Sequence, residues 1–324
     1  MESDYQHISV LADEIVEYLQ PKKNQHFIDC TLGGGGHTGL ILNKTAPKGK
    51  VLAFELDARA RKAAKANLKQ YNDRLIIVAK SYAHLQEQYG KHKKDLPQIS
   101  GILMDLGLSS DQLDRANRGF SFKDDGPLDM RFDTKNQTLT ASEIILEWPE
   151  DKLIKVFQEY GEVVSSRRLA KGLVSWRKTL PKQKQKAIKS SMLVGTILRI
   201  LKISPTSLGR FRTHPATRIF QALRIAVNSE LENLTKVLPQ TLDILAPGGR
   251  LAVISFHSLE DRIVKHYFKN LNRGCICPPE SPVCNCDTKP VVKIITKKVI
   301  KPTQKEITKN RRSRSALLRV IEKI

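Results

Sequence analysis

The chain has 324 residues, of which 40% are hydrophobic and 27% charged, and it carries 55 Lys and Arg against 33 Asp and Glu. This composition is that of a globular protein with enough residues for one large or two ordinary domains. No apolar run is long enough to span a membrane, the first residues lack a signal-peptide pattern, and the five cysteines are an odd number. We therefore expect a cytosolic protein without a disulfide framework.

The net charge of +22 comes largely from two segments. Residues 163–229 hold fifteen Lys and Arg and no Asp or Glu, and residues 289–324 hold twelve Lys and Arg with only Glu306 and Glu322. Solvated faces ordinarily mix both signs, so an acid-free stretch of this length indicates a surface that faces phosphates. The sequence therefore predicts a nucleic-acid partner rather than a membrane.

Residues 26–57 have the pattern strand, glycine loop, helix, strand. An apolar run over residues 26–32 stops at four consecutive glycines, a helix is expected from His37 to Asn43, and the next apolar strand ends at Glu55. Glycines let a ligand approach the backbone closely, and a helix start offers free N–H groups. An acidic side chain at the tip of the second strand can accept hydrogen bonds from ribose hydroxyls. The pattern predicts a cofactor that contains a nucleoside.

Two cofactors fit this pattern. Gly34-x-Gly36-x-x-Gly39 loosely matches the dinucleotide fingerprint. Asp29, four residues before the first glycine, instead gives an acid-x-x-x-Gly-x-Gly pattern, which resembles the first motif of Rossmann-like methyltransferases that use S-adenosylmethionine. We favour the methyl donor, with a dinucleotide and a tight turn without any ligand as the alternatives.

The chain then continues to alternate between strands and helices. A helix is expected over residues 58–70, and strands over 75–79, 99–106 and 250–256. This order predicts an α/β fold with a Rossmann-like, doubly wound and mostly parallel sheet, whose ligands bind at the carboxyl ends of the strands. The side chains at those ends are Asp29, Glu55, Tyr82 and Asp105.

The pattern changes between these strands. Residues 115–138 show no periodicity and read as a long loop, and three helices are expected after it, at 150–160, 165–178 and 192–201. We therefore expect an inserted all-helical domain at 111–213 within a discontinuous α/β domain, 1–110 and 214–324. One long helix is predicted over residues 214–234.

Several stretches resemble, in order, the motifs of the bacterial 16S ribosomal RNA cytosine-N4-methyltransferase family. They are His7-x-x-Val10-Leu11, the Gly33–His37 loop, DLGLSSDQLD at 105–114, RGFSF at 118–122, DGPLDMR at 125–131, HPATRIFQALRIAVNSEL at 214–231 and PGGRLAVISFHSLEDRIVK at 247–265. The resemblance implies a class I methyltransferase fold, S-adenosyl-L-methionine as the cofactor, and methyl transfer to the exocyclic N4 of a cytidine in 16S ribosomal RNA, at the decoding centre of the small subunit. It also implies that the helical insertion recognises the substrate.

By this resemblance, the residues that contact the cofactor are Gly35, Gly36, His37, Glu55, Tyr82, Asp105 and Gln112. Glu55 would accept from the ribose hydroxyls, and the Tyr82 ring would pack on the adenine. Asp105 would accept from the adenine or the aminoacyl end, while backbone N–H groups hold the carboxylate. The family usually has Asp in place of Glu55, and Asp57 could share or replace this role.

The implied reaction needs a proton acceptor, because the N4 lone pair of cytosine is delocalised into the ring. The enzyme must hold N4 in line with the methyl group and accept an amine proton. The candidate catalytic residues are Asp105, Ser109 and His257, with Ser110, Ser255 and Ser258 also placed around the base. Phe120 or Phe122 could stack on an unstacked cytidine, or could anchor the loop on the core.

The four cysteines near the C-terminus are Cys275, Cys277, Cys284 and Cys286. Four thiolates within twelve residues could hold zinc, although the C-x-C spacing is tight and no histidine accompanies it. A reduced loop is the alternative, and we predict no metal.

Three other functions are weighed against a ribosomal RNA methyltransferase. A DNA cytosine-N4-methyltransferase would have a (Ser/Asp)-Pro-Pro-(Tyr/Trp) motif where this chain has Asp-Leu-Gly-Leu at 105–108. A catalytically idle RNA-binding assembly factor and a dehydrogenase are the others. The expected partner is 16S ribosomal RNA or the small ribosomal subunit, with no membrane and no DNA, and the chain could act as a monomer or a homodimer.

Overall fold

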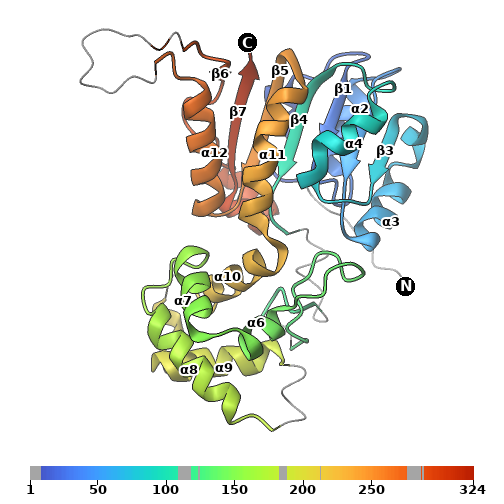
Figure 1. Cartoon of the computed structure of the whole chain (residues 1–324). Coiled ribbons are helices and arrows are strands. Elements are labelled where there is room, and N and C mark those ends of the chain that lie inside the picture. Colours follow the sequence, from blue (N-terminus) through green and yellow to red (C-terminus); the bar gives the residue numbers. More distant parts are fainter. Residues whose placement is uncertain are drawn as a thin grey trace. The chain divides into compact units, whose positions relative to one another are not determined.

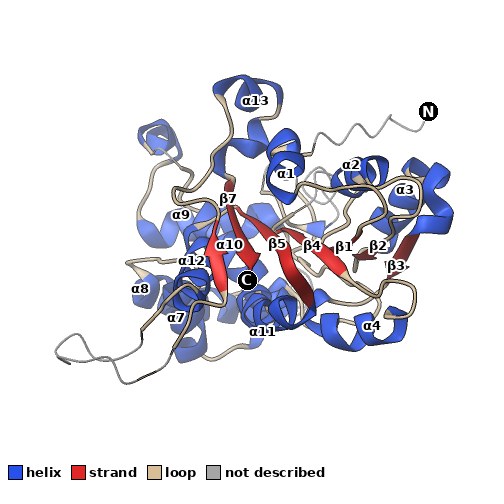
Figure 2. Cartoon of the chain, turned by 90° about the horizontal axis from the view of Figure 1, so that it is seen from above, coloured by secondary structure: helices blue, strands red, loops and turns tan. Residues whose placement is uncertain are grey.

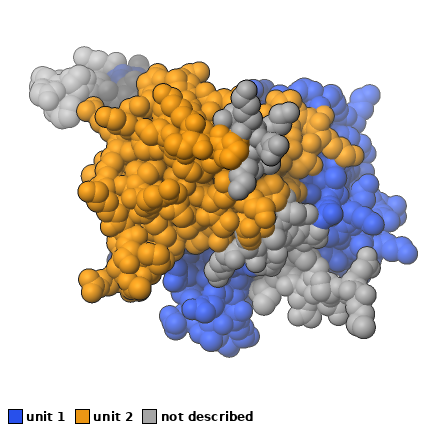
Figure 3. All heavy atoms as spheres, turned by 90° about the horizontal axis from the view of Figure 1, so that it is seen from below, with its two compact units in different colours: residues 1–107, 231–324 blue, residues 108–230 orange. Residues whose placement is uncertain are grey.

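The computed structural model describes residues 9–108, 118–122, 125–181, 188–211, 213–275, 286 and 288–324. The chain divides into two compact units, coloured separately in Figure 3. Unit 1 comprises residues 1–107 and 231–324, and unit 2 comprises residues 108–230. The domain boundary expected at 213/214 lies one helix before this division.

The strands described in unit 1 form one seven-stranded sheet with the order β3-β2-β1-β4-β5-β7-β6 (Figure 1). β7 runs antiparallel to the other six strands, which are parallel to one another. The predicted Rossmann-like, mostly parallel sheet is therefore confirmed. The strands are β1 (His26–Asp29), β2 (Val51–Phe54), β3 (Leu75–Val78), β4 (Ile99–Asp105), β5 (Leu245–Ser255), β6 (Val292–Ile294) and β7 (Leu317–Lys323).

Helices cover both faces of this sheet (Figure 2). One face carries α1 (Ala12–Leu19), α2 (Gly36–Lys44) and α3 (Ala58–Asn67), and the other carries α4 (Leu85–His92), α11 (Glu230–Ile244) and α12 (Ser258–Leu271). Successive side chains of a strand point to opposite faces of the sheet. Phe27 therefore packs in the apolar cluster on the face that carries α1, and Ile28 packs in the cluster on the face that carries α4. Both faces are buried, which explains why β1, β2 and β4 read as continuous apolar runs.

The register of the strands aligns their carboxyl ends. Asp29, the last residue of β1, lies between Ala53 of β2 and Leu103 of β4, and Asp105 pairs with Ile254 of β5. Since β7 is antiparallel, the chain enters β7 at the same edge of the sheet. This edge carries the candidate site.

Unit 2 contains α6 (Ala141–Glu147), α7 (Glu150–Glu159), α8 (Ser166–Lys178), α9 (Ser190–Leu201) and α10 (Thr217–Asn228). The three helices predicted in this region are α7, α8 and α9, and the described part of residues 115–138 contains no helix or strand longer than one residue. Phe120 is buried and stacks on Phe132, while Phe122 packs against Phe220 and His214. Of the two roles considered for these phenylalanines, the structure shows the loop anchor.

The prediction of one long helix over residues 214–234 is wrong. Ser229 adopts a left-handed conformation with φ of 49°, which ends α10 and separates it from α11. The Asn228 amide donates to the carbonyls of Met130 and Arg224, and its oxygen accepts from the Phe132 N–H. The two bonds to Met130 and Phe132 tie the end of α10 to the preceding loop and fix the break. The hydrophobic periodicity of the helix does not indicate these bonds.

Further helices and strands lie outside the sequence-based prediction. They are the short connecting helices η1 (Lys69–Arg74), η2 (Tyr82–His84), η5 (Pro205–Arg210) and η6 (Arg311–Ser315), the helices α4, α6, α12 and α13 (Gln304–Lys309), and the strands β6 and β7. Among the described residues, the longest apolar stretch within a helix falls short of a membrane span.

Candidate cofactor site

The glycine loop connects β1 to α2 with a conformation that needs glycine. Gly33 and Gly35 have φ of 51° and 88°. A Cβ on Gly35 would lie 2.6 Å from Leu68 Cδ1, so a side chain at this position would be both strained and blocked. Asn67 Nδ2 donates to the Gly34 carbonyl at 3.0 Å and ties the loop to α3. The loop is therefore packed closely between Ser9 and α3, and neither Gly35 nor Gly36 has room for a side chain.

Asp29 binds residues on both sides of the glycine loop. Its Oδ2 accepts from Thr38 Oγ1 at 2.6 Å, and its Oδ1 accepts from the Thr31 N–H at 2.9 Å. Thr31 Oγ1 in turn accepts from the Asp105 N–H at 2.7 Å. Burial raises the pKa of Asp29, although the Thr38 hydroxyl partly opposes this. Asp29 therefore links the ends of β1 and β4, and it is fully covered by its neighbours.

Glu55 lies at the tip of β2 with its carboxylate turned to the glycine loop. Its Oε2 accepts from the Gly33 N–H at 2.9 Å and its Oε1 from the Asp57 N–H at 2.8 Å. Burial raises the pKa of Glu55 to about 7, against the effect of these two N–H groups. Asp57 is the N-cap of α3 and accepts from the Arg59 N–H. The geometry therefore gives the two acids different positions, with Glu55 facing the loop.

Asp105, at the end of β4, has an unused acceptor. Its Oδ2 lies 3.6 Å from Nδ1 of His37, while its buried Oδ1 accepts no hydrogen bond from the described residues. Burial raises the pKa of Asp105 to about 6, with Asp29 and Glu260 raising it further and His37 opposing. Buried acceptors are rarely left without a donor, so this oxygen is a position where a ligand can donate.

His37, at the start of α2, is held by the segment before α1. Its Nε2 lies 2.8 Å from the Val10 carbonyl, and because a carbonyl can only accept, Nε2 carries a proton. Nδ1 is thus the nitrogen that faces Asp105. The side chain is only 6% exposed.

His257 follows β5 and is engaged by Glu260. Its Nδ1 accepts from the Glu260 N–H at 3.4 Å, and its Nε2 lies 3.1 Å from Glu260 Oε1. His257 is therefore the N-cap of α12, and Glu260 returns to the backbone N–H groups of Phe256 and His257. This capping box positions the end of β5 beside Asp105.

The other predicted site residues fall into two groups. Tyr82 begins η2 after β3, half-buried, and packs against the apolar cluster of the sheet face that carries α4. Ser255 is buried at the end of β5, and Ser258 begins α12. The remaining residues lie outside the described part of the chain: Ser109, Ser110 and Gln112.

Two of the four cysteines are described. Cys275 Sγ lies 3.7 Å from Cys286 Sγ, and Cys277 and Cys284 lie outside the described residues. Within the described part of the chain, no three His, Cys, Asp or Glu side chains are grouped to hold a metal. The expectation that these cysteines hold no metal stays a prediction, because two of the four are outside the described residues.

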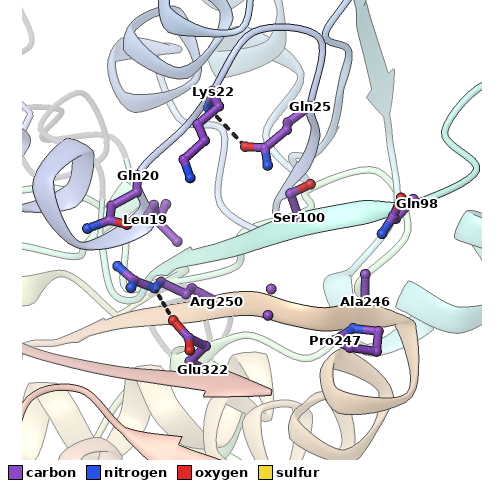
Figure 4. Close-up of a pocket in the computed structure, with 12 residues that line it drawn as sticks. Leu19, Gln20, Lys22, Gln25, Gln98, Ser100, Ala246, Pro247, Arg250 and Glu322 are labelled. Carbon is purple, nitrogen blue, oxygen red and sulfur yellow. Dashed lines mark hydrogen bonds and ion pairs between the residues drawn. The ribbon is translucent and has the colours of Figure 1, made fainter. Parts of the chain in front are cut away.

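A pocket of about 240 Å³ lies at the opposite edge of the sheet (Figure 4). Its lining comes from the starts of β4 and β5 and the end of α1, and includes Gln20, Lys22, Gln98, Ser100 and Arg250. Arg250 is already paired with Glu322 at 2.8 Å. None of the predicted site residues lines this pocket, which is therefore separate from the candidate site.

The charge of the candidate site distinguishes between the two cofactors weighed above. Three carboxylates with raised pKa values, Asp29, Glu55 and Asp105, meet at one edge of the sheet. A dinucleotide would bring two phosphates to this acidic edge, whereas S-adenosylmethionine brings a sulfonium and an ammonium. The Asp105 oxygen that accepts no hydrogen bond from the described residues fits the latter.

Three contributors to the site were not found from the sequence. Thr31 and Thr38 bind Asp29, and Glu260 holds His257. The His-x-x-Glu spacing at 257–260 has the form of a capping box, which could have indicated Glu260. Nothing in the sequence pattern singles out the two threonines.

Comparison with known proteins agrees with the motifs. The model of the MraW methylase family matches residues 4–324. A protein of Heliobacterium mobile named ribosomal RNA small subunit methyltransferase H is 44% identical, with 99% of this chain and 100% of that protein covered. Proteins of the same name from Brevibacillus brevis and Syntrophotalea carbinolica are 42% and 41% identical, each covering 99% of this chain and 98% of the relative. The methyltransferase identified from the motifs is thereby confirmed, and the chain belongs to the MraW methylase family.

Proposed function

We propose that this chain transfers a methyl group from S-adenosylmethionine to the N4 of a cytidine in 16S ribosomal RNA of the small subunit. The buried Oδ1 of Asp105, which accepts no hydrogen bond from a described residue, is the observation that carries this proposal. Family membership and the printed names of the relatives support the substrate class.

In this proposal the acidic edge holds the cofactor. Glu55 accepts from the ribose hydroxyls, Tyr82 packs on the adenine, and the N–H groups of Gly36 and His37 hold the carboxylate. The Gly35 N–H already donates to the Leu32 carbonyl, so Gly35 is assigned a contact by close approach only. Gln112 is assigned to the cofactor by resemblance alone. When bound, S-adenosylmethionine supplies a methyl group that is already activated on a positively charged sulfur.

Asp105 is the residue that we assign to the proton on N4. With a pKa of about 6 it is ionised at neutral pH, and its Oδ1 has room for a donor. The N4–H would donate to this oxygen. As the methyl group passes to N4, its bond to the sulfonium breaks with the electron pair left on sulfur, and the carboxylate would take the N4 proton. Of the other candidates, His257 accepts from the Glu260 N–H through Nδ1, while its buried Nε2 lies 3.1 Å from Glu260 Oε1 without a hydrogen bond, so it is the second candidate. Ser109 is assigned by resemblance alone.

Unit 2 is assigned to RNA recognition. Its helix α8 exposes four cations, Arg167, Arg168, Lys171 and Lys178, and none of them forms an ion pair with a described residue. Cations without acidic neighbours can neutralise phosphates and release counterions. This is the acid-free segment that the sequence indicated.

The test is methyl transfer to isolated small subunits that lack the modification. The chain is incubated with subunits and radiolabelled S-adenosylmethionine, and the RNA is digested to nucleosides. We expect the label in N4-methylcytidine. Label in any other nucleoside, or none in the RNA, would refute the substrate assignment.

Calorimetry on the same protein separates the other functions. We expect S-adenosylmethionine to bind and NAD not to bind. Asp105→Asn should reduce both cofactor affinity and the turnover rate, whereas Asp95→Asn, an exposed aspartate at the opposite edge of the sheet, should change neither. A chain that binds RNA but not the cofactor would be an assembly factor instead.

A further inference from the structure

The connection between β6 and β7, residues 295–316, is strongly basic. It contains eight Lys and Arg and a single acid, Glu306. Seven of these cations are exposed and form no ion pair with any described residue: Lys297, Lys298, Lys301, Lys305, Lys309, Arg311 and Arg314. The cations of such a surface repel one another, and a bound polyanion relieves this repulsion.

The sheet register places this connection beside the cofactor site. Ile294, the last residue of β6, pairs with Ile321, and Leu317, the first residue of β7, pairs with Ser255 at the end of β5. The chain therefore leaves β6 and enters β7 at the edge that carries Asp105 and His257. These cations belong to unit 1 and are therefore distinct from the cations of unit 2.

The only acid in the connection holds it in place. Glu306 Oε1 accepts from the Leu11 N–H at 2.8 Å, and Leu11 has a left-handed φ of 52° at the start of α1. The preceding residue, Val10, offers its carbonyl to His37 Nε2 at 2.8 Å. A second tie is the pairing of Ile300 with Leu318. The connection is thus attached, through residues 10 and 11, to the segment that positions His37.

We propose that the β6–β7 connection is an RNA-binding surface of unit 1, which contacts the phosphates of the substrate next to the cofactor site. This inference rests on the proposed function for the identity of the RNA. The surface has one acid, and that acid is used internally, so the exposed charge is of one sign. The partner it fits is a phosphate backbone, bound without regard to base sequence.

The salt dependence of RNA binding tests this surface. A triple variant, Lys305→Gln, Lys309→Gln and Arg311→Gln, removes three of its charges. The matched control is Lys48→Gln, Lys93→Gln and Lys94→Gln, three exposed lysines of unit 1 that precede β2 and β4 at the opposite edge. Affinity for the small subunit is measured by filter binding between 0.05 and 0.5 M salt (about the usual range for such series).

Each phosphate contact in single-stranded RNA contributes about 0.7 to the slope of log affinity against log salt. We therefore expect the surface variant to lose about 2 from this slope and up to about a hundredfold in affinity at about 0.1 M salt. The control should match the wild type, and both variants should keep the wild-type thermal midpoint and cofactor affinity. Equal slopes in all three proteins, or a wild-type affinity that does not change with salt, would overturn the proposal.

The methyl product is identified in the same preparations. If label fails to reach N4-methylcytidine while the surface variant loses its salt slope, the proposed reaction is wrong and the surface stands. If label reaches N4-methylcytidine and the slopes are equal, the reaction stands and the surface is wrong.

Discussion

Replacing Asp105 by Asn should stabilise the fold while weakening cofactor binding. Burial raises the pKa of Asp105 from 3.8 to about 6, a shift of about two units. One unit corresponds to about 1.4 kcal/mol, so keeping this carboxylate ionised in the folded state costs up to about 3 kcal/mol. Asparagine has nearly the same shape and no charge, and none of the described residues donates to Oδ1.

The direction of the pH effect on stability follows from the pKa of Asp105 in the folded and the unfolded chain. In the unfolded chain Asp105 ionises near 3.8, and in the folded chain it keeps its proton to about 6. Between these values the folded state binds more protons, so the free energy of unfolding falls as pH rises through this window. The Asn variant lacks this fall. It should therefore equal the wild type near pH 4 and exceed it by about 1–3 kcal/mol at pH 7.

The same variant should bind S-adenosylmethionine more weakly. The variant removes a buried negative charge next to a cofactor that carries a sulfonium and an ammonium. A charge-assisted interaction of this kind is worth about 1.5–3 kcal/mol, which is about a tenfold to hundredfold loss of affinity. Urea denaturation at pH 4.5 and 7 gives the stability, and calorimetry at pH 7 gives the affinity. A variant that is less stable than the wild type at pH 7, or that binds the cofactor equally well, would refute this reasoning. Asp95→Asn is the control, since Asp95 is exposed and pairs with Lys50.

Three further changes test other parts of the structure. Thr38→Val should destabilise the chain by about 2–3 kcal/mol in urea denaturation, because the buried Asp29 loses a hydroxyl donor at 2.6 Å; Thr38→Ser should retain most of the stability, and an unchanged Val variant would contradict the contact. Asn228→Ala removes two bonds between α10 and the preceding loop and one within α10, and should cost about 2–4 kcal/mol; a loss below about 0.5 kcal/mol would show that these bonds do not fix the helix break. Glu306→Ala should speed hydrogen exchange at the Leu11 amide by about tenfold, whereas Glu306→Gln should not; equal exchange in both would argue against the bond.

The parts of the fold that could be predicted are those whose local pattern and tertiary role agree. β1, β2 and β4 are buried on both faces, so their apolar runs and the glycines after β1 identify them. The break at Ser229 could not be predicted, because it depends on Asn228 binding a loop almost a hundred residues earlier. β7 was missed because Arg319 and Glu322 interrupt its apolar residues.

The candidate site likewise has features that could be predicted from the sequence and features that could not. Asp29, Glu55 and Asp105 each end a recognisable strand, so their meeting at one edge follows from parallel topology. Which of their oxygens are already satisfied does not follow, since this depends on hydroxyls such as that of Thr38 and on the Gly33 N–H. The roles of these residues toward a ligand stay predictions.

The distribution of charge at this edge explains how one small area can serve two ligands of opposite sign. The carboxylates of Asp29 and Asp105 are buried, and their repulsion toward phosphate is only weakly screened. The cations of residues 295–316 are exposed, so they attract a polyanion in solution while salt limits their reach to about 8–10 Å. If the two sets were exchanged, RNA phosphates would compete for the cofactor pocket. In the function proposed above, the buried acids would attract the small cationic cofactor, and the exposed cations would hold the RNA backbone at the surface.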